Sequence, residues 1–171
     1  MFKRSGIKRL FKNKDHYQDI RHYQKYREKI LKINPEIIFH MAAQPIVKSG
    51  YDYPLHTFES NILGTANTIN IARDLVSLKS LIIITTDKCY KDVKKKGYIE
   101  DDVLGGYDPY SSSKACAELI TESMRNSYFN KSIVQISTVR AGNVVGGGDW
   151  SDGRLVPDMI RSIENKKIFL V

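Results

Sequence analysis

The stretch Leu81-Ile82-Ile83-Ile84-Thr85-Thr86-Asp87-Lys88 decides the fold, because an apolar run typical of a buried β-strand breaks there into hydroxyl, carboxylate and ammonium side chains. In open parallel sheets, ligands bind beyond the carboxyl ends of the strands. A second apolar run, Ile133-Val134-Gln135-Ile136, leads in the same way into Thr138-Val139-Arg140-Ala141-Gly142-Asn143. Two successive strands that end in polar groups predict an active site at one edge of a parallel sheet.

Helical periodicity lies before and between these strands. The spacing of Tyr23, Tyr26, Ile30 and Ile33 is typical of a helix with one apolar face, which Asn34-Pro35 ends. The other expected elements are a strand over 36–43, a helix with the apolar stripe Ile62, Ala66, Ile69, Ala72 and Val76, a strand over 81–86, a basic loop over 91–106, a helix over about 110–129 and a strand over 133–140. This alternation predicts an α/β fold with a doubly wound parallel sheet and right-handed crossovers.

Tyr110 and Lys114 are the first candidates for chemistry. Residues four positions apart share one face of a helix, so the ammonium can lower the pKa of the phenol until the phenol takes a hydroxyl proton near neutral pH. The same spacing is frequent in ordinary surface pairs. The polar strand ends on either side of this helix favour the catalytic interpretation.

A series of ordered motifs resembles the extended short-chain dehydrogenase/reductase family of NAD-dependent epimerases and dehydratases. The resemblance runs from about Asp15 to the last residue. Within the family, three motifs resemble the CDP-glucose 4,6-dehydratase subgroup: Asp87-Lys88, Gly105-Gly106-Tyr107-Asp108-Pro109 and Gly146-Gly147-Gly148-Asp149-Trp150. The dTDP-glucose dehydratases usually carry Asp-Glu in place of Asp87-Lys88. The motifs that carry the wider resemblance are His40-Met41-Ala42-Ala43-Gln44-Pro45, Asn61-Ile62-Leu63-Gly64-Thr65, Thr85-Thr86-Asp87-Lys88-Cys89-Tyr90, the segment from Tyr110 to Lys114, Arg140-Ala141-Gly142-Asn143 and Arg154-Leu155-Val156-Pro157-Asp158.

The resemblance implies NAD-dependent conversion of CDP-glucose to CDP-4-keto-6-deoxyglucose, a step toward deoxysugars of lipopolysaccharide. It implies that Tyr110 takes the 4-hydroxyl proton, that Lys114 holds the cofactor ribose, and that Thr86 hydrogen-bonds the same hydroxyl. Asp87 would be the acid that protonates the leaving 6-hydroxyl, which requires burial, and Lys88 would be the base at C5. A simple ion pair between Lys88 and Asp87 is the alternative.

The remaining residues implied by the resemblance would bind cofactor and substrate. Asp19 and Ile20 resemble the adenine-contacting end of the family's third strand, in Tyr17-Gln18-Asp19-Ile20-Arg21. Asn143 and Arg154 are expected at the substrate diphosphate and nucleotide. The small side chains in the segment 42–44 would allow NAD to approach the backbone closely, although ordinary packing of a helix on a strand also explains them. The further cofactor-contact residues expected are Ala42, Ala43, Gln44 and Asn61.

The resemblance also implies an incomplete unit. We expect residues 1–171 to form one incomplete NAD(P)-binding Rossmann-like domain that lacks the first two strands and the glycine-rich loop, with residues 1–14 as a basic leading segment and the substrate domain largely absent. The edge of the strand at 37–43 would then be exposed. Weak NAD binding follows from the missing loop.

Composition limits the other functions. The formal net charge of +8 falls within residues 1–32, which hold eleven Lys or Arg and three Asp or Glu; without a reader motif it favours a solvated helix face over nucleic-acid binding. We expect no membrane span, no metal site and a cytoplasmic setting for the two cysteines. The resemblance implies that the complete protein is a homodimer through the helices beginning near Phe58 and Tyr110. The alternatives are a related UDP-hexose epimerase or dTDP-glucose dehydratase, a silent fragment, and a basic nucleic-acid-binding module.

Overall fold

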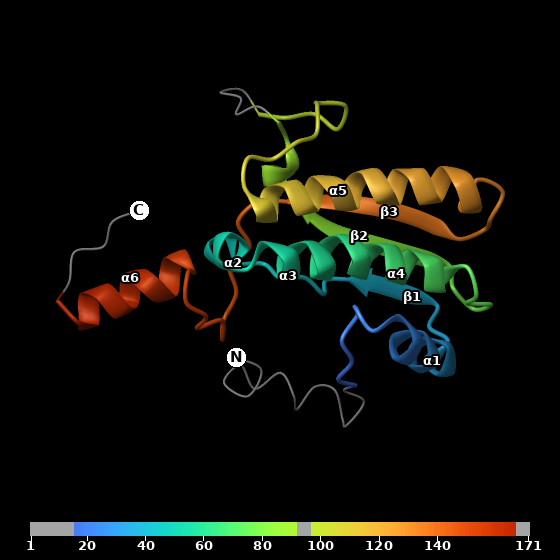
Figure 1. Ribbon diagram of the computed structural model, residues 1–171, viewed down its shortest axis with the longest axis horizontal. Helices are drawn as coiled ribbons and strands as arrows, with labels where there is room; N and C mark the ends of the chain where they lie inside the picture. The colour runs from blue at the N-terminus through green and yellow to red at the C-terminus, as the bar shows by residue number, and fades with distance from the viewer. Residues whose placement is uncertain (1–15, 92–96, 167–171) are drawn as a thin grey trace. The chain divides into compact units, whose positions relative to one another are not determined.

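The computed structural model describes residues 16–91 and 97–166, so the basic leading segment 1–14 lies outside the described residues. The chain divides into two compact units, one over 18–142 and one that holds 143–166. The helices and strands, labelled in Figure 1, are α1 (Tyr23–Ile33), β1 (Ile37–His40), α2 (Val47–Asp52), α3 (Pro54–Phe58), the π-helical turn η2 (Glu59–Leu63), α4 (Gly64–Ala72), β2 (Ser80–Thr86), the 3-10 turn η3 (Asp87–Cys89), α5 (Pro109–Met124), the π-helical turn η4 (Arg125–Phe129), β3 (Gln135–Ala141) and α6 (Leu155–Glu164).

The three strands form one parallel sheet in the order β1-β2-β3, which confirms the predicted α/β class. Ile37 pairs with Ser80, and Thr86 pairs with Ala141, so the carboxyl ends of β2 and β3 meet at one edge. The first strand is shorter than expected. It ends at His40 because the Met41 N–H turns back to the Phe39 carbonyl at 3.1 Å, which places residues 42–44 in a loop.

Helices α4 and α5 contact each other and lie along the same face of the sheet (Figure 1). The core forms between them and this face, from Ile69 and Ile71 of α4, Leu81 and Ile83 of β2, and Ile136 of β3. Alternate strand residues point to opposite faces, and on the other face Ile37 and Phe39 are exposed. Among the described residues β1 pairs with β2 alone and is an edge strand, as the sequence predicts.

Helix α1 packs on α4 through an apolar face that matches the predicted one in part. Tyr26 is buried, and its hydroxyl lies 3.2 Å from Thr68 Oγ1. Ile33 is 46% exposed, so it does not belong to that face. Asn34 ends the helix in the left-handed conformation with φ of 46°, and its N–H donates to the Ile30 carbonyl at 2.9 Å.

Two sequence predictions near these helices were wrong. Val76 is 90% exposed, because α4 ends at Ala72 and the helical run starts earlier, at Pro54. The segment expected as a strand around Asp19 is instead a turn: the Arg21 N–H donates to Asp19 Oδ1 at 2.9 Å, and no strand precedes β1 in the described part of the chain. The side chain of Asp turns the backbone here by accepting the N–H two residues on.

A long connection joins β2 to α5. Tyr90 and Leu104 form an antiparallel bridge, and the Gly105 N–H donates to the Cys89 carbonyl at 2.8 Å. Gly106 has φ of +100°, and a Cβ there would lie 2.5 Å from the Ser111 carbonyl carbon. This position therefore requires glycine, which lets the connection turn directly into α5.

The second unit contains α6, whose first turn is closed by Asp158: its side chain accepts the Gly153 N–H at 2.9 Å and the Arg161 guanidinium at 2.6 Å. Across residues 16–91 and 97–166, no helix combines the length and the apolar character that crossing a membrane requires.

Candidate active site at the carboxyl ends of the strands

The start of α5 is built to present Tyr110. Asp108 caps the helix, with Oδ1 accepting the N–H of Tyr110 at 2.9 Å and of Ser111 at 3.1 Å. Pro109 follows as the first helical residue, a position where its missing N–H costs nothing. From another side, Gly50 of α2 packs against this turn so closely that a Cβ on it would lie 3.2 Å from Tyr110 N. The backbone of Tyr110 is thus held from two sides.

Lys114 lies one turn further along the same face and is buried, with 8% of its surface exposed. Its ammonium donates to the Ile84 carbonyl of β2 at 2.9 Å, which ties α5 to the strand two residues before Thr86. Burial lowers the pKa of Lys114 from 10.5 to about 8, partly offset by the Glu118 carboxylate. An ammonium has three N–H donors, so this contact uses only one of them.

Thr86 is buried at the end of β2, and its hydroxyl contacts the two residues that follow. It donates to Asp87 Oδ1 at 3.3 Å and accepts the Lys88 N–H at 3.3 Å. Asp87 also lies beside the end of β3, since a Cβ on Gly142 would be 3.4 Å from Asp87 Oδ2. The predicted meeting of two polar strand ends is therefore present.

Asp87 and Lys88 differ from expectation in their burial. Both side chains are exposed on η3, so the burial that an acid at Asp87 and a desolvated amine at Lys88 would need is not found here. The reason is that the 3-10 turn carries both residues past the last paired residue of β2. The desolvated amine of this site is Lys114 instead.

Gln44 and Asn61 form a buried clasp next to this helix. Asn61 Oδ1 accepts the Gln44 N–H at 2.7 Å, and its amide donates to the Gln44 carbonyl at 3.1 Å and to Ser113 Oγ at 2.8 Å. Ser113 Oγ in turn donates to the Tyr110 carbonyl at 2.6 Å. Asn61 sits in the π-helical turn η2, a local widening that is frequent at functional sites. The clasp joins the loop after β1 to α5.

The other residues expected at a cofactor lie in different settings. Ala42 is exposed and Ala43 half-buried in the loop after β1. Asp19 is held by Arg21, whose Nη2 lies 2.6 Å from Asp19 Oδ2, and hydrogen bonds with Arg21 lower the pKa of this carboxyl to about 2. Ile20 packs against α4 so tightly that a Cβ on Gly64 would lie 2.3 Å from its Cδ1.

Asn143 and Arg154 belong to the second compact unit. Arg154 Nε lies 3.1 Å from Asp149 Oδ2 within that unit. Their contact with substrate stays a prediction. Within the described ranges, no three His, Cys, Asp or Glu side chains are grouped so that they could hold a metal ion.

Three further residues near this site were given no role in the sequence analysis, although two of them, His40 and Arg140, lie within its motifs. His40 is buried between Thr65 and Thr68, and burial, followed by the charge of Lys114, lowers its pKa to about 4. Glu118 and Arg140 form a buried ion pair with Arg140 Nη2 3.1 Å from Glu118 Oε2. Glu118 lies four residues after Lys114, and this continuation of the 110, 114 spacing was a usable signal.

Comparisons with known proteins agree with this arrangement. The family model described as GDP-mannose 4,6 dehydratase matches residues 3–168. The CDP-glucose 4,6-dehydratase of Salmonella typhimurium is 44% identical over 162 residues, which cover 91% of this chain and 45% of that protein. The UDP-glucose 4-epimerase of Mycoplasma pneumoniae is 25% identical over 91% of this chain and 48% of that protein. The chain thus spans about half the length of these curated relatives.

Solved structures show the same fold. The dTDP-glucose 4,6-dehydratase of Streptomyces venezuelae, crystallised with NAD, superposes with a TM-score of 0.77 at 21% identity, over 87% of this chain and 44% of that one. At this identity the likeness speaks for the fold alone. The extent of the family match carries the assignment: this chain belongs to the GDP-mannose 4,6 dehydratase family, within the extended short-chain dehydrogenases/reductases.

Proposed function

We propose that α5 and the end of β2 form part of the active site of an NAD-dependent sugar-nucleotide 4,6-dehydratase whose substrate is CDP-glucose. The observation that carries this proposal is the bond from Lys114 Nζ to the Ile84 carbonyl, which draws the Tyr110 face of α5 to the strand end that carries Thr86. The 44% identity to a CDP-glucose 4,6-dehydratase supports the reaction and the substrate.

The first half of the reaction is oxidation at C4 of the hexose. Tyr110 takes the proton of the 4-hydroxyl, Thr86 hydrogen-bonds the same oxygen, and Lys114 favours the charged phenolate. When bound, NAD would accept the hydride from C4 and return it to C6 after water has left, while a proton returns to C5. The exposed Ala42 and half-buried Ala43 after β1 fit a cofactor that approaches closely, and the free donors of the Lys114 ammonium fit its ribose.

The second half is loss of water across C5 and C6. The 4-keto group makes the C5 proton acidic, so a base removes it while an acid protonates the departing 6-hydroxyl. We assign the acid to Asp87 and the base to Lys88, which follow Thr86 on η3. Because both are exposed in this structure, their roles require substrate or further protein to exclude water from them. Asn143 and Arg154 remain our candidates for the diphosphate and nucleotide.

A catalytically silent chain is the competing proposal, and the exposure of Asp87 and Lys88 favours it for the elimination step. A related sugar-nucleotide epimerase is the other alternative, supported by the 25% identity to UDP-glucose 4-epimerase. An epimerase inverts C4 and loses no water. The identity of the product therefore separates all three.

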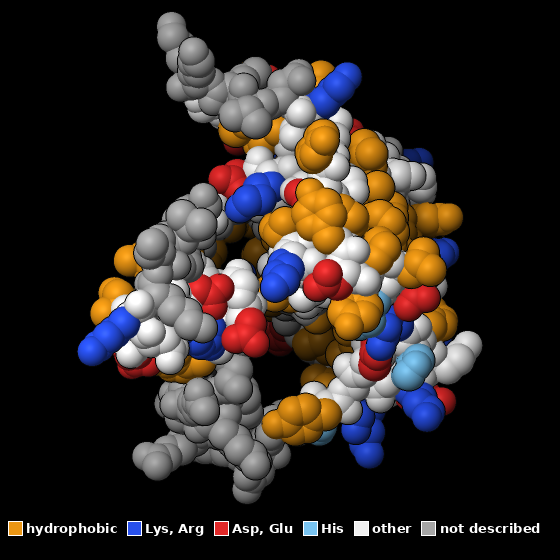
Figure 2. Space-filling view, turned by 60° about the vertical axis from the view of Figure 1, so that its left-hand side comes forward, with side chains coloured by type: hydrophobic (Ala, Val, Ile, Leu, Met, Phe, Trp, Pro, Cys, Tyr) orange, Lys and Arg blue, Asp and Glu red, His pale blue; other side chains and the backbone are white. Residues whose placement is uncertain are grey.

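A homodimer is part of the proposal. Leu55 of α3, Leu63 of η2 and Leu119 of α5 are each more than half exposed, although they lie on helices that otherwise pack against the core. Figure 2 shows that apolar side chains reach the surface in groups as well as singly. Large contiguous apolar patches mark association surfaces. The two free thiols, Cys89 and Cys116, are consistent with a cytoplasmic setting.

The test is product formation from CDP-glucose with NAD, followed by mass spectrometry, for the wild type and Tyr110→Phe. We expect 4-keto-6-deoxy product from the wild type and a loss of about 10² to 10⁴ in rate from the variant, the usual contribution of a general base. Tyr107→Phe is the matched control, since Tyr107 is fully exposed three residues earlier. Equal turnover by Tyr110→Phe would remove Tyr110 from the mechanism. Absence of product from the wild type would favour the silent chain.

A further inference from the structure

The ion pair between Glu118 and Arg140 is the centre of a buried polar network on the same face of α5 as Tyr110 and Lys114. Glu118 Oε1 accepts from Thr85 Oγ1 of β2, and Glu118 Oε2 accepts from Thr138 Oγ1 at 2.8 Å and from Arg140 Nη2 at 3.1 Å. Only 5% of the Glu118 side chain and 17% of the Arg140 side chain are exposed. The pair therefore joins α5, β2 and β3.

The other half of the Arg140 guanidinium holds the connection between β2 and α5. Nη1 donates to the Tyr90 hydroxyl at 3.1 Å and to the Glu100 carbonyl at 2.8 Å. The guanidinium carbon lies 5.0 Å from the centre of the Tyr90 ring, and Tyr90 stacks on Tyr98 with 4.1 Å between ring centres. Burial alone would lower the pKa of Arg140, but hydrogen bonds to Glu118 and Tyr90 outweigh it and raise the pKa.

This connection has the candidate catalytic residues at both of its ends. Asp87 and Lys88 directly precede Cys89, whose carbonyl accepts the Gly105 N–H, and the Lys91 N–H donates to the Val103 carbonyl at 2.8 Å. The connection then turns at Gly106 and leads to Asp108, which caps α5, and to Tyr110. Whatever holds the connection therefore acts, together with the Lys114 bond to the Ile84 carbonyl, on how the two halves of the site lie relative to each other.

We propose that Arg140 and Glu118 are positioning residues, which anchor the connection between β2 and α5 and thereby fix Asp87 and Lys88 relative to Tyr110. This inference rests on the proposed function for its catalytic consequence. An apolar pair of equal volume could stabilise the fold as well as a buried ion pair does. It could not supply the planar fork that binds a carboxylate, a phenol and a backbone carbonyl at once. The residue types thus indicate alignment rather than stability alone.

Cys89 offers a probe of the anchor that needs neither cofactor nor substrate. Its thiol is completely buried at the start of the connection, and burial raises its pKa to about 11, so it reacts only when the structure around it opens. Cys116, partly exposed on α5, serves as the internal reference. Alkylation of the full chain with iodoacetamide, followed by peptide mass spectrometry, gives the rate at each thiol separately.

In Arg140→Met we expect Cys89 to be alkylated about tenfold faster, while the rate at Cys116 is unchanged. A factor of about ten corresponds to the free energy lost when a hydrogen bond to a charged group is removed. Arg140→Lys keeps a charge for Glu118 but cannot bind all three partners, so it should leave the urea midpoint near the wild-type value and still raise the Cys89 rate. Glu118→Gln should also raise the rate of Cys89 alkylation. Arg73→Met is the matched control, because Arg73 also stacks on a tyrosine, Tyr128, at 4.1 Å.

Three results would overturn the proposal: an unchanged Cys89 rate in Arg140→Met, equal acceleration of both thiols, or the same acceleration in Arg73→Met. Turnover adds the catalytic half of the test. Where the wild type forms product, Arg140→Lys should lower kcat more than it changes KM, and an unchanged kcat would refute the positioning role. A wild type without product would refute the proposed function, whereas the thiol rates would still decide whether the anchor exists.

Discussion

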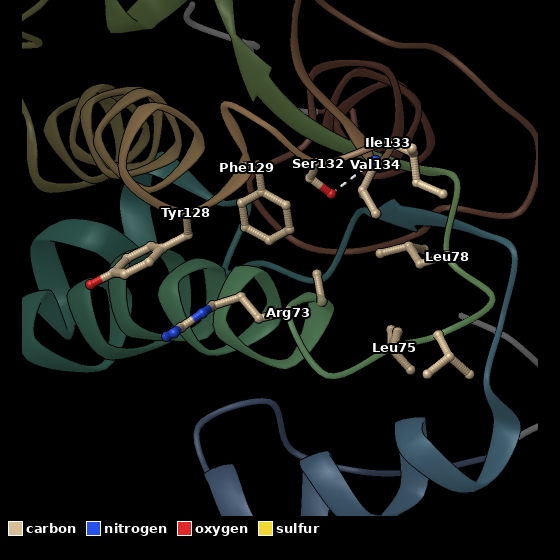
Figure 3. A pocket seen from close by; sticks show the side chains of 10 residues that line it. Arg73, Leu75, Leu78, Tyr128, Phe129, Ser132, Ile133 and Val134 are labelled. Carbon is tan, nitrogen blue, oxygen red and sulfur yellow. Dashed lines mark hydrogen bonds between the residues drawn. The ribbon is translucent and has the colours of Figure 1, made fainter.

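The two ends of the sheet are built on opposite principles. At the amino end, a cavity of about 340 Å³ lies between the end of α4 and η4, with apolar side chains such as Leu75, Leu78, Phe129 and Val134 in its walls (Figure 3). At the carboxyl end, many of the buried side chains are polar: Asn61 donates to Ser113, and Glu118 accepts from Thr85. The amino end stabilises the fold by burying apolar side chains, whereas the polar contacts at the carboxyl end align α5 with the strands.

The contrast has a physical cause. Burying a polar group costs free energy unless it finds a partner, so each buried polar side chain must be surrounded by others that match it. Apolar side chains need only fill space. The carboxyl end is therefore specific and intolerant of single changes in chemistry, whereas the amino end is sensitive mainly to changes in volume.

The largest effect on stability should come from the amino end. Leu78 is almost completely buried in the core, and Leu78→Ala should lower the free energy of unfolding by about 3 to 4 kcal/mol through lost burial and a larger cavity. Urea denaturation measures the change. Val76→Ala, two residues away and exposed, is the control and should cost less than about 0.5 kcal/mol. A small effect of Leu78→Ala would mean that this end is not the source of stability.

The polar end should add a pH dependence that the apolar end lacks. The pKa of His40 is about 4 in the folded chain and about 6.5 when unfolded, so between these values the unfolded chain binds more protons. Stability should therefore be full above pH 6.5, fall as the pH drops, and level off below about pH 4, with a loss of up to about 3 kcal/mol.

Urea midpoints from pH 7 to pH 4 test this, with His40→Gln as the comparison. The variant should be less stable at pH 7, where the two contacts to Thr65 and Thr68 are formed, and the difference from the wild type should shrink toward pH 4. A difference that does not change with pH would show that His40 is not the titrating group.

Much of the fold follows from local patterns in the sequence. The apolar run before Thr85 and the spacing around Tyr26 predict the strand and helix correctly, because burial on one face leaves a period that single residues reveal. The turn at Asp19 could not be found this way, since the strand expected there rested on the family resemblance, whereas a side chain to backbone bond bends the chain. The prediction that Val76 continues the apolar stripe of α4 was wrong for a related reason, because periodicity does not show where a helix stops.

The candidate site could be predicted only as a list of residues. The spacing of Tyr110 and Lys114 predicts their shared helix face, but whether a side chain is buried depends on long-range packing. That is why Lys114 is the desolvated amine while Lys88 is exposed. The partners of Glu118 lie on β2 and β3, 20 to 33 residues away in the chain, and no local pattern encodes such a distance.

The smallest of the effects on stability should come from the clasp at Asn61. Asn61→Ala leaves the buried Gln44 N–H without its 2.7 Å partner and frees Ser113, so we expect a loss of about 2 kcal/mol in the free energy of unfolding. Asn70→Ala is the matched control, because Asn70 lies two turns and more along the same helical run and its contact to Tyr23 is only half-buried. If the clasp aligns α5, Asn61→Ala should also weaken turnover more than Leu78→Ala does, although it costs less stability. The reverse order would mean that the polar end contributes packing alone, and the contrast between the two ends would then lose its functional meaning.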